Sequence, residues 1–198
     1  LVRFAALLHD VGHGPFSHAA EELFPKKEDG LGRFTHEEYS AAIIRSRLRD
    51  AIEKHRFNDN KKITADEIAA LIDGSAKAER AVFWREIVSG QMDADRMDYL
   101  LRDSLHTGVQ YGRYDLHRLL STVQAVEIVA GEETTHRIGM SEGGVHAAEA
   151  LVLARYFMFT QVYFHKTRVA CDIHLREALK EILPGQVFPK PTDHEVDD

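Results

Sequence analysis

The chain has almost no cysteine: Cys171 is the only one among 198 residues. A single cysteine excludes an internal disulfide and any zinc site built from several cysteines, and it suits the reducing cytoplasm. The sequence also lacks a signal peptide and any apolar run long enough to span a bilayer. We therefore expect a soluble, cytoplasmic protein that has no membrane partner.

Basic residues are in deficit. Lys and Arg total 25 against 32 Asp and Glu, which gives a net charge of -7, and the two signs are interleaved along the chain. This balance argues against a general nucleic-acid binder, because a long polyanion is bound through a surplus of positive charge. Hydrophobic residues make up 44% of the chain, enough for one globular domain with its own core.

Both ends of the sequence indicate a longer protein. Leu1 opens the chain inside an apolar run typical of a buried helix, and the acidic residues 192–198 show no core pattern. We expect residues 1–198 to be a single domain taken from a longer chain, with further helices upstream. Residues 184–198 are expected to form a loop or tail.

Helical patterns predict an all-α fold with a small β-hairpin. Capping boxes at Thr35–Glu38 and Thr64–Glu67 indicate two helix starts, and Gly74 ends the second of these helices. The hairpin is expected over residues 127–138, around Gly131. The stretch 145–183 lacks glycine and proline, which predicts one long helix or two in close succession. The other expected helices span residues 2–8, 81–88, 92–105 and 116–123.

Residues 9–18 read His-Asp-Val-Gly-His-Gly-Pro-Phe-Ser-His. His9 and Asp10 follow the first expected helix, and an adjacent His-Asp pair offers an imidazole nitrogen and a carboxylate oxygen to one divalent metal ion. A polar helix end is the ordinary interpretation of such residues. Three histidines in one tight loop are hard to explain in that way, so the sequence predicts a metal-dependent active site.

A second polar cluster lies on the helix expected over 92–105. Asp95, Tyr99 and Asp103 are spaced i, i+4, i+8 and share one stripe of that helix. A solvated polar face is the usual fate of such a run. Two carboxylates on one stripe repel each other unless a cation is near, so this stripe is also a source of a further carboxylate ligand.

A third stripe comes from the stretch 145–183. Arg155, Phe159 and Tyr163 again follow i, i+4, i+8 spacing, with Lys166 nearby. The neighbouring Phe157, Met158 and Val162 fit a core interpretation. Arg155 and Lys166, on or near the aromatic stripe, are also of the kind that closes a pocket around phosphate, which Arg binds in bidentate fashion.

Four strings combine these observations: His9–His18, Thr35-His36-Glu37, Asp93–Tyr99 with Arg102-Asp103, and Tyr163–Lys166. Together they resemble the HD-domain superfamily of metal-dependent phosphohydrolases. More narrowly, the chain is similar to the deoxynucleoside-triphosphate triphosphohydrolases, which include the SAM- and HD-domain dNTPase of mammals and bacterial relatives. The first string is specific to this branch, and the third supports it.

The resemblance implies a metal site and a set of catalytic groups. His9, Asp10 and Asp95 would bind the metal, with a fourth ligand, a histidine, expected upstream of residue 1. Because His and Asp ligands admit manganese, iron, nickel, cobalt, zinc or magnesium, the ion is expected only to be divalent. The implied catalytic residues are His13 beside the scissile phosphate, His18 and His36 near the phosphate chain, and Glu21, which would orient a catalytic histidine.

The resemblance also implies how a nucleotide would be held. Arg96, Arg155 and Lys166 would counter phosphate charge. Tyr99, Asp103 and Tyr163 would hold the deoxyribose, with Asp103 accepting a hydrogen bond from its 3′-hydroxyl.

The implied activity is hydrolysis of a dNTP at the α-phosphorus to a deoxynucleoside and inorganic triphosphate. A homo-oligomer and an activating nucleotide are expected from the same resemblance. Two alternatives stay open: an HD phosphohydrolase that acts on nucleoside monophosphates or phosphodiesters, and a non-catalytic nucleotide-binding regulatory module. Nucleic acid is not the expected substrate.

Overall fold

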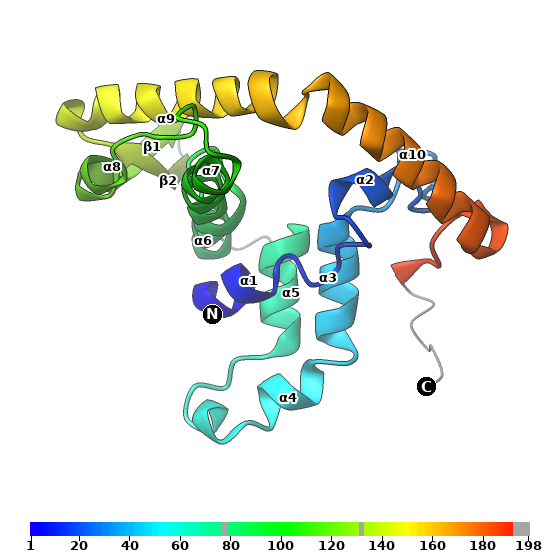
Figure 1. Cartoon of the computed structure of the whole chain (residues 1–198). Helices are drawn as coiled ribbons and strands as arrows, with labels where there is room; N and C mark the ends of the chain where they lie inside the picture. The colour runs from blue at the N-terminus through cyan, green and yellow to red at the C-terminus, as the bar shows by residue number, and fades with distance from the viewer. Residues whose placement is uncertain (77–78, 131–132, 192–198) are drawn as a thin grey trace. The chain divides into compact units, whose positions relative to one another are not determined.

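The computed structural model describes residues 1–76, 79–130 and 133–191. It divides the chain into two compact units (Figure 1). The first unit combines Leu1–Ala76 with the chain from Ala170 onward, and the second ends at Val169. The single domain expected from the sequence stays a prediction, and the acidic tail 192–198 lies outside the described residues.

In the described residues of the first unit, the regular elements are helices joined by loops. Helix α3 packs against α5, and α1 also contacts α5. Its core includes the fully buried side chains of Ile44, Ile68, Leu71 and Ile72. The bounds of its helices are α1 (Val2–Leu8), α2 (His18–Glu21), α3 (His36–Arg45), α4 (Arg49–Glu53) and α5 (Ala65–Asp73), with a 3-10 turn at Arg56–Asn58 and the greater part of α10 (Lys166–Ile182).

Local capping signals explain where two of these helices begin and end. Thr35 precedes α3 and Thr64 precedes α5, and each forms a capping box with the glutamate three residues on. Gly74 ends α5 with φ 75°, a left-handed conformation that glycine adopts without a steric penalty. Both boxes predicted from the sequence are therefore confirmed.

The second unit combines helices with a two-stranded antiparallel sheet. Its buried core cluster includes Met97, Leu100, Leu119, Leu151 and Met158. Its elements are α6 (Glu79–Ser89), α7 (Ala94–Thr107), α8 (Leu116–Thr122), β1 (Val123–Ala130), β2 (Glu133–Met140), α9 (Val145–Met158) and the π-helical turn η3 (Phe159–Tyr163).

The predicted fold class, all-α with a small hairpin, is confirmed. The hairpin is longer than expected: it pairs Val123 with Met140 at its open end, whereas the sequence pattern placed Val123 in the preceding helix. That helix ends at Thr122, and Val123 adopts extended backbone angles. The expected turn residue Gly131 lies outside the described residues.

The stretch 145–183 contains two helices in close succession, one of the two predicted outcomes. The π-helical turn Phe159–Tyr163 follows α9 directly, and α10 begins at Lys166. Helix α4 was not predicted, because it is short and the residue before it, Leu48, has no side chain that can cap a helix. None of the helices in the described ranges is long and apolar enough to cross a membrane.

Candidate active site

The adjacent pair His9 and Asp10 follows the last turn of α1. His9 Nδ1 donates a hydrogen bond to the carbonyl of Ala6 at 2.9 Å, so the proton on the ring is held at Nδ1. His9 Nε2 lies 3.1 Å from Asp10 Oδ1. Two atoms that bind one metal ion at about 2.0–2.2 Å are about 3 Å apart, so this donor pair fits a divalent ion. The backbone hydrogen bond is the kind of outer contact that orients a metal-binding histidine.

The loop after this pair packs tightly on α3. Gly12 N donates to Ser40 Oγ at 2.9 Å, and Ser40 Oγ donates to the His9 carbonyl at 2.5 Å. A Cβ atom at Gly12 would lie only 2.2 Å from Ser40 N. Ser40 is completely buried. The sequence analysis missed Ser40; its only signal is the i+4 spacing from His36, which places both on one face of α3.

A strained turn then leads into α2. Phe16 has φ 65° and Ser17 has φ 53°, both in the left-handed region that non-glycine residues rarely adopt. Such residues persist where the surrounding structure holds them, often beside functional groups. Here the turn places His18 at the first residue of α2.

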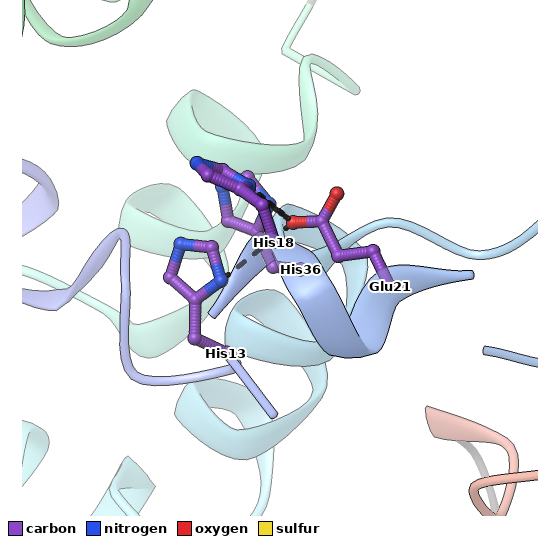
Figure 2. A group of neighbouring side chains, drawn as sticks. All are labelled: His13, His18, Glu21 and His36. Atoms are coloured by element: carbon purple, nitrogen blue, oxygen red, sulfur yellow. Dashed lines mark hydrogen bonds and ion pairs between the residues drawn. The ribbon is translucent and has the colours of Figure 1, made fainter. Parts of the chain in front are cut away.

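Three histidines converge on one carboxylate oxygen, as Figure 2 shows. Glu21 Oε1 lies 2.7 Å from His36 Nδ1, 2.8 Å from His18 Nδ1 and 3.6 Å from His13 Nδ1. The rings of His13 and His36 are stacked, with centroids 3.9 Å apart and planes 15° apart. The structure thus brings together all four of the catalytic residues predicted from the sequence.

Asp10 lies at the opposite edge of the stacked rings. Its Oδ1 is 3.5 Å from His13 Nε2 and 4.0 Å from His36 Nε2. The hydrogen bond with His13 lowers the pKa of Asp10 despite partial burial. Burial favours the neutral form of Glu21, but hydrogen bonds from His18 and His36 outweigh it and lower its pKa to about 2. Two ionised carboxylates therefore lie beside the histidines at neutral pH.

The predicted sugar-binding residues meet within the second unit. Tyr163 Oη donates to Asp103 Oδ2 at 2.6 Å, and the Tyr99 and Tyr163 rings are 6.1 Å apart. Burial and the bond to Asp103 raise the pKa of Tyr163, which keeps its hydroxyl protonated as a donor. Tyr99 is hydrogen-bonded to Arg155, and its pKa is raised chiefly by burial.

The three predicted phosphate-binding cations differ in their surroundings. Arg155 lies over the Phe159 ring at 5.2 Å, and its buried Nε has no hydrogen-bond partner within the described part of the chain. Arg96 donates to the carbonyl of Gly90. Lys166 is exposed at the first residue of α10.

Asp95, the third metal ligand expected, occupies the first turn of α7 in the second unit. Asp93 caps the start of this helix, because its side chain accepts a hydrogen bond from Arg96 N at 2.7 Å. Asp95 and the six substrate residues thus belong to the second unit, and the metal-binding pair and the histidines belong to the first. That the residues of the two units form one site stays a prediction.

Comparison with known proteins identifies the family of the chain. Residues 1–103 match the HD domain family, and residues 114–198 match an HD-associated region. The chain is 35% identical to YwfO, an uncharacterised protein of Bacillus subtilis, over 88% of this chain and 35% of that protein. It is 29% identical to a deoxynucleoside triphosphate triphosphohydrolase SAMHD1 homolog of Dictyostelium discoideum, over 91% of this chain and 33% of that protein.

A solved phosphohydrolase structure from Bacteroides thetaiotaomicron is also similar. It has a TM-score of 0.61 and 31% sequence identity, over 98% of this chain and 43% of that one. The chain spans about a third of the length of the curated relatives that head the comparison.

Proposed function

The chain belongs to the HD-domain family, and from this premise we propose that it forms the catalytic part of a metal-dependent phosphohydrolase that acts on deoxynucleoside triphosphates. The observation that carries the proposal is the set of three histidines around Glu21, two of which also face Asp10, beside the His9-Asp10 pair. This arrangement supplies metal donors and proton donors from one short loop and two helices.

The metal would be held by His9, Asp10 and Asp95. A divalent ion there supplies Lewis acidity toward a phosphoryl oxygen and toward the attacking water. His13 and His36, flanked by carboxylates on both edges, would hold a proton next to the reacting phosphate. A histidine in such surroundings suits proton transfer to the leaving oxygen near neutral pH.

The residues of the second unit and the names of relatives support the proposed substrate class. Tyr99, Asp103 and Tyr163 would hold a deoxyribose, and the buried, unpartnered Nε of Arg155 supports a contact with phosphate. Arg96 and Lys166 would add positive charge along the triphosphate. The name of the Dictyostelium relative supports the same substrate. Attack at the α-phosphorus would release a deoxynucleoside and intact triphosphate.

A product analysis tests the proposal. The full-length protein, loaded with Mn²⁺, is incubated with each dNTP and with mixtures that contain an activating nucleotide, and the products are separated by chromatography. A deoxynucleoside together with triphosphate is the expected result. Turnover of nucleoside monophosphates or phosphodiesters alone would replace the substrate assignment, and failure on every phosphate ester would favour a regulatory module.

A variant pair tests the role of the histidines. His13→Ala is expected to lower kcat at least about 100-fold, the usual contribution of a positioned proton donor, while the metal content stays unchanged. His146→Ala is the control, since His146 is 96% exposed and lies on α9. Loss of metal from His13→Ala would contradict its assignment as a non-ligand.

A further inference from the structure

The histidine cluster has a geometry that proton transfer does not require. The Nδ1 atoms of His13, His18 and His36 all point at Glu21 Oε1, at 3.6, 2.8 and 2.7 Å. One donor atom from each of the four residues lies within 4.8 Å of every other. Around a tetrahedral ion with bonds of about 2.0–2.1 Å, neighbouring ligand atoms are about 3.3 Å apart. The three distances to the carboxylate oxygen bracket this value.

The outer contacts favour Nδ1 as the metal-binding atom. A histidine that binds through Nδ1 carries its proton on Nε2, which needs an acceptor. Asp10 Oδ1 faces Nε2 of His13 at 3.5 Å and Nε2 of His36 at 4.0 Å, and Glu37 Oε1 lies 3.6 Å from His36 Nε2. Carboxylates in this position orient metal-binding histidines and make them more basic.

Rigidity and access also suit a bound ion. The side chains of His13 and His36 are only 14% and 15% exposed and stack on one another, so they lose little freedom on binding. His18 is 66% exposed and leaves one side open to solvent. The cluster therefore combines two fixed ligands with one that an ion can reach from outside.

We propose that His13, His18, Glu21 and His36 form a second metal site, separate from the site of the His9-Asp10 pair. Three imidazoles and one carboxylate favour a borderline ion such as Zn²⁺ or Co²⁺ over Mg²⁺, which prefers oxygen ligands. An ion there occupies the Nδ1 lone pairs and the carboxylate that orients them. Under the proposed function, such an ion blocks proton transfer, so the site makes the enzyme sensitive to inhibition by Zn²⁺.

Cobalt titration tests metal binding without relying on turnover. The full-length protein is freed of metal with a chelator and titrated with Co²⁺, whose visible absorption is strong in tetrahedral and weak in octahedral coordination. Metal bound per chain is measured in parallel. Asp95→Asn, which removes a ligand expected only at the first site, is expected to keep the tetrahedral signal.

Two variants in the cluster are compared with a matched pair elsewhere. His18→Ala is expected to bind one Co²⁺ fewer per chain and to lose the tetrahedral signal, and Glu21→Gln to bind this ion at least about tenfold more weakly. His146 and Glu149 on α9 form the same i, i+3 contact at 2.8 Å but involve one histidine instead of three. The Co²⁺ content and spectra of His146→Ala and Glu149→Gln should therefore match those of the wild type. Circular dichroism checks that the variants fold.

The outcomes separate this inference from the proposed function. Equal Co²⁺ content and equal spectra in wild type and His18→Ala would overturn the second site, whatever the protein hydrolyses. A cobalt signal that depends on His18, in a protein that hydrolyses no dNTP, would support the site and refute the substrate. If both stand, micromolar Zn²⁺ added to the Mn²⁺-loaded enzyme should lower turnover, and a chelator should restore it.

Discussion

Gly12→Ala is expected to be among the most damaging single changes in the first unit. The added Cβ would lie 2.2 Å from Ser40 N, 2.5 Å from His36 O and 2.7 Å from Tyr39 C, all backbone atoms of α3. Ordinary contact begins near 3.4 Å, so the loop must move by about 1.2 Å, the difference between 3.4 and 2.2 Å. Backbone atoms inside a helix cannot rotate away as a side chain does.

The magnitude follows from two costs. Overpacking of a tight contact costs about 1–3 kcal/mol. The shift also breaks the bond from Gly12 N to Ser40 Oγ, and leaving buried polar groups unsatisfied costs about 1–3 kcal/mol more. We therefore expect the free energy of unfolding to fall by about 2–6 kcal/mol. Because the same loop carries His9, Asp10 and His13, a shift near 1 Å should lower kcat about 100-fold in the molecules that stay folded.

Urea denaturation followed by circular dichroism measures the first quantity, and steady-state turnover below the unfolding range measures the second. Ser40→Ala keeps the space and removes only the hydroxyl, so it should cost about 1–3 kcal/mol, less than Gly12→Ala. Ser46→Ala, which removes an exposed hydroxyl bonded to Ala42 O, should stay within about 0.5 kcal/mol of the wild type. Wild-type stability and turnover in Gly12→Ala would refute the reasoning.

Three further changes probe other parts of the chain. Asp73→Asn should destabilise the protein at neutral pH. Burial raises the pKa of Asp73, but hydrogen bonds from Ser75 and Arg45 outweigh burial, so the pKa lies below its ordinary value of 3.8. In denaturation at several pH values, the stability advantage of the wild type should therefore be full above pH 3.8 and should shrink as the pH falls below it. Tyr163→Phe removes the donor to Asp103 and should raise KM for a dNTP about 5- to 10-fold with little change in kcat; an unchanged KM would remove this pair from the sugar site. Glu86→Ala removes the acceptor for Ile138 N, so it should lower the free energy of unfolding by about 1–3 kcal/mol and speed hydrogen exchange in β2. Unchanged exchange would show that α6 does not anchor the strand.

Helix starts were predictable where the signal is local. Thr35 and Thr64 each form a capping box within four residues, so the sequence alone places the first turns of α3 and α5. The extent of the hairpin could not be predicted, because Val123 follows an apolar helical pattern and also has a β-branched side chain that favours a strand. Its pairing with Met140, 17 residues later, decides in favour of the strand.

The candidate site also has a part that the sequence predicts and a part that it does not. The string of residues 9–18 predicts that histidines and a carboxylate gather in one loop. It carries no information on which ring atoms face which oxygen, since the stacking of His13 on His36 depends on how the loop packs against α3. Ser40 escaped prediction for this reason: a buried serine in a helix becomes informative only when its partners, Gly12 and His9, are seen beside it.

The contact of Tyr163 with Asp103 depends on the π-helical turn Phe159–Tyr163. A π turn is wider than an α turn and is reached by inserting one residue into a regular helix. Because each residue of a π turn advances by less than the roughly 100° of an α-helix, the same five residues in α-helical geometry would turn Tyr163 away from Asp103. Descendants of this sequence can therefore exchange side chains here, but a change that returns all five residues to α-helical geometry is expected to be removed by selection.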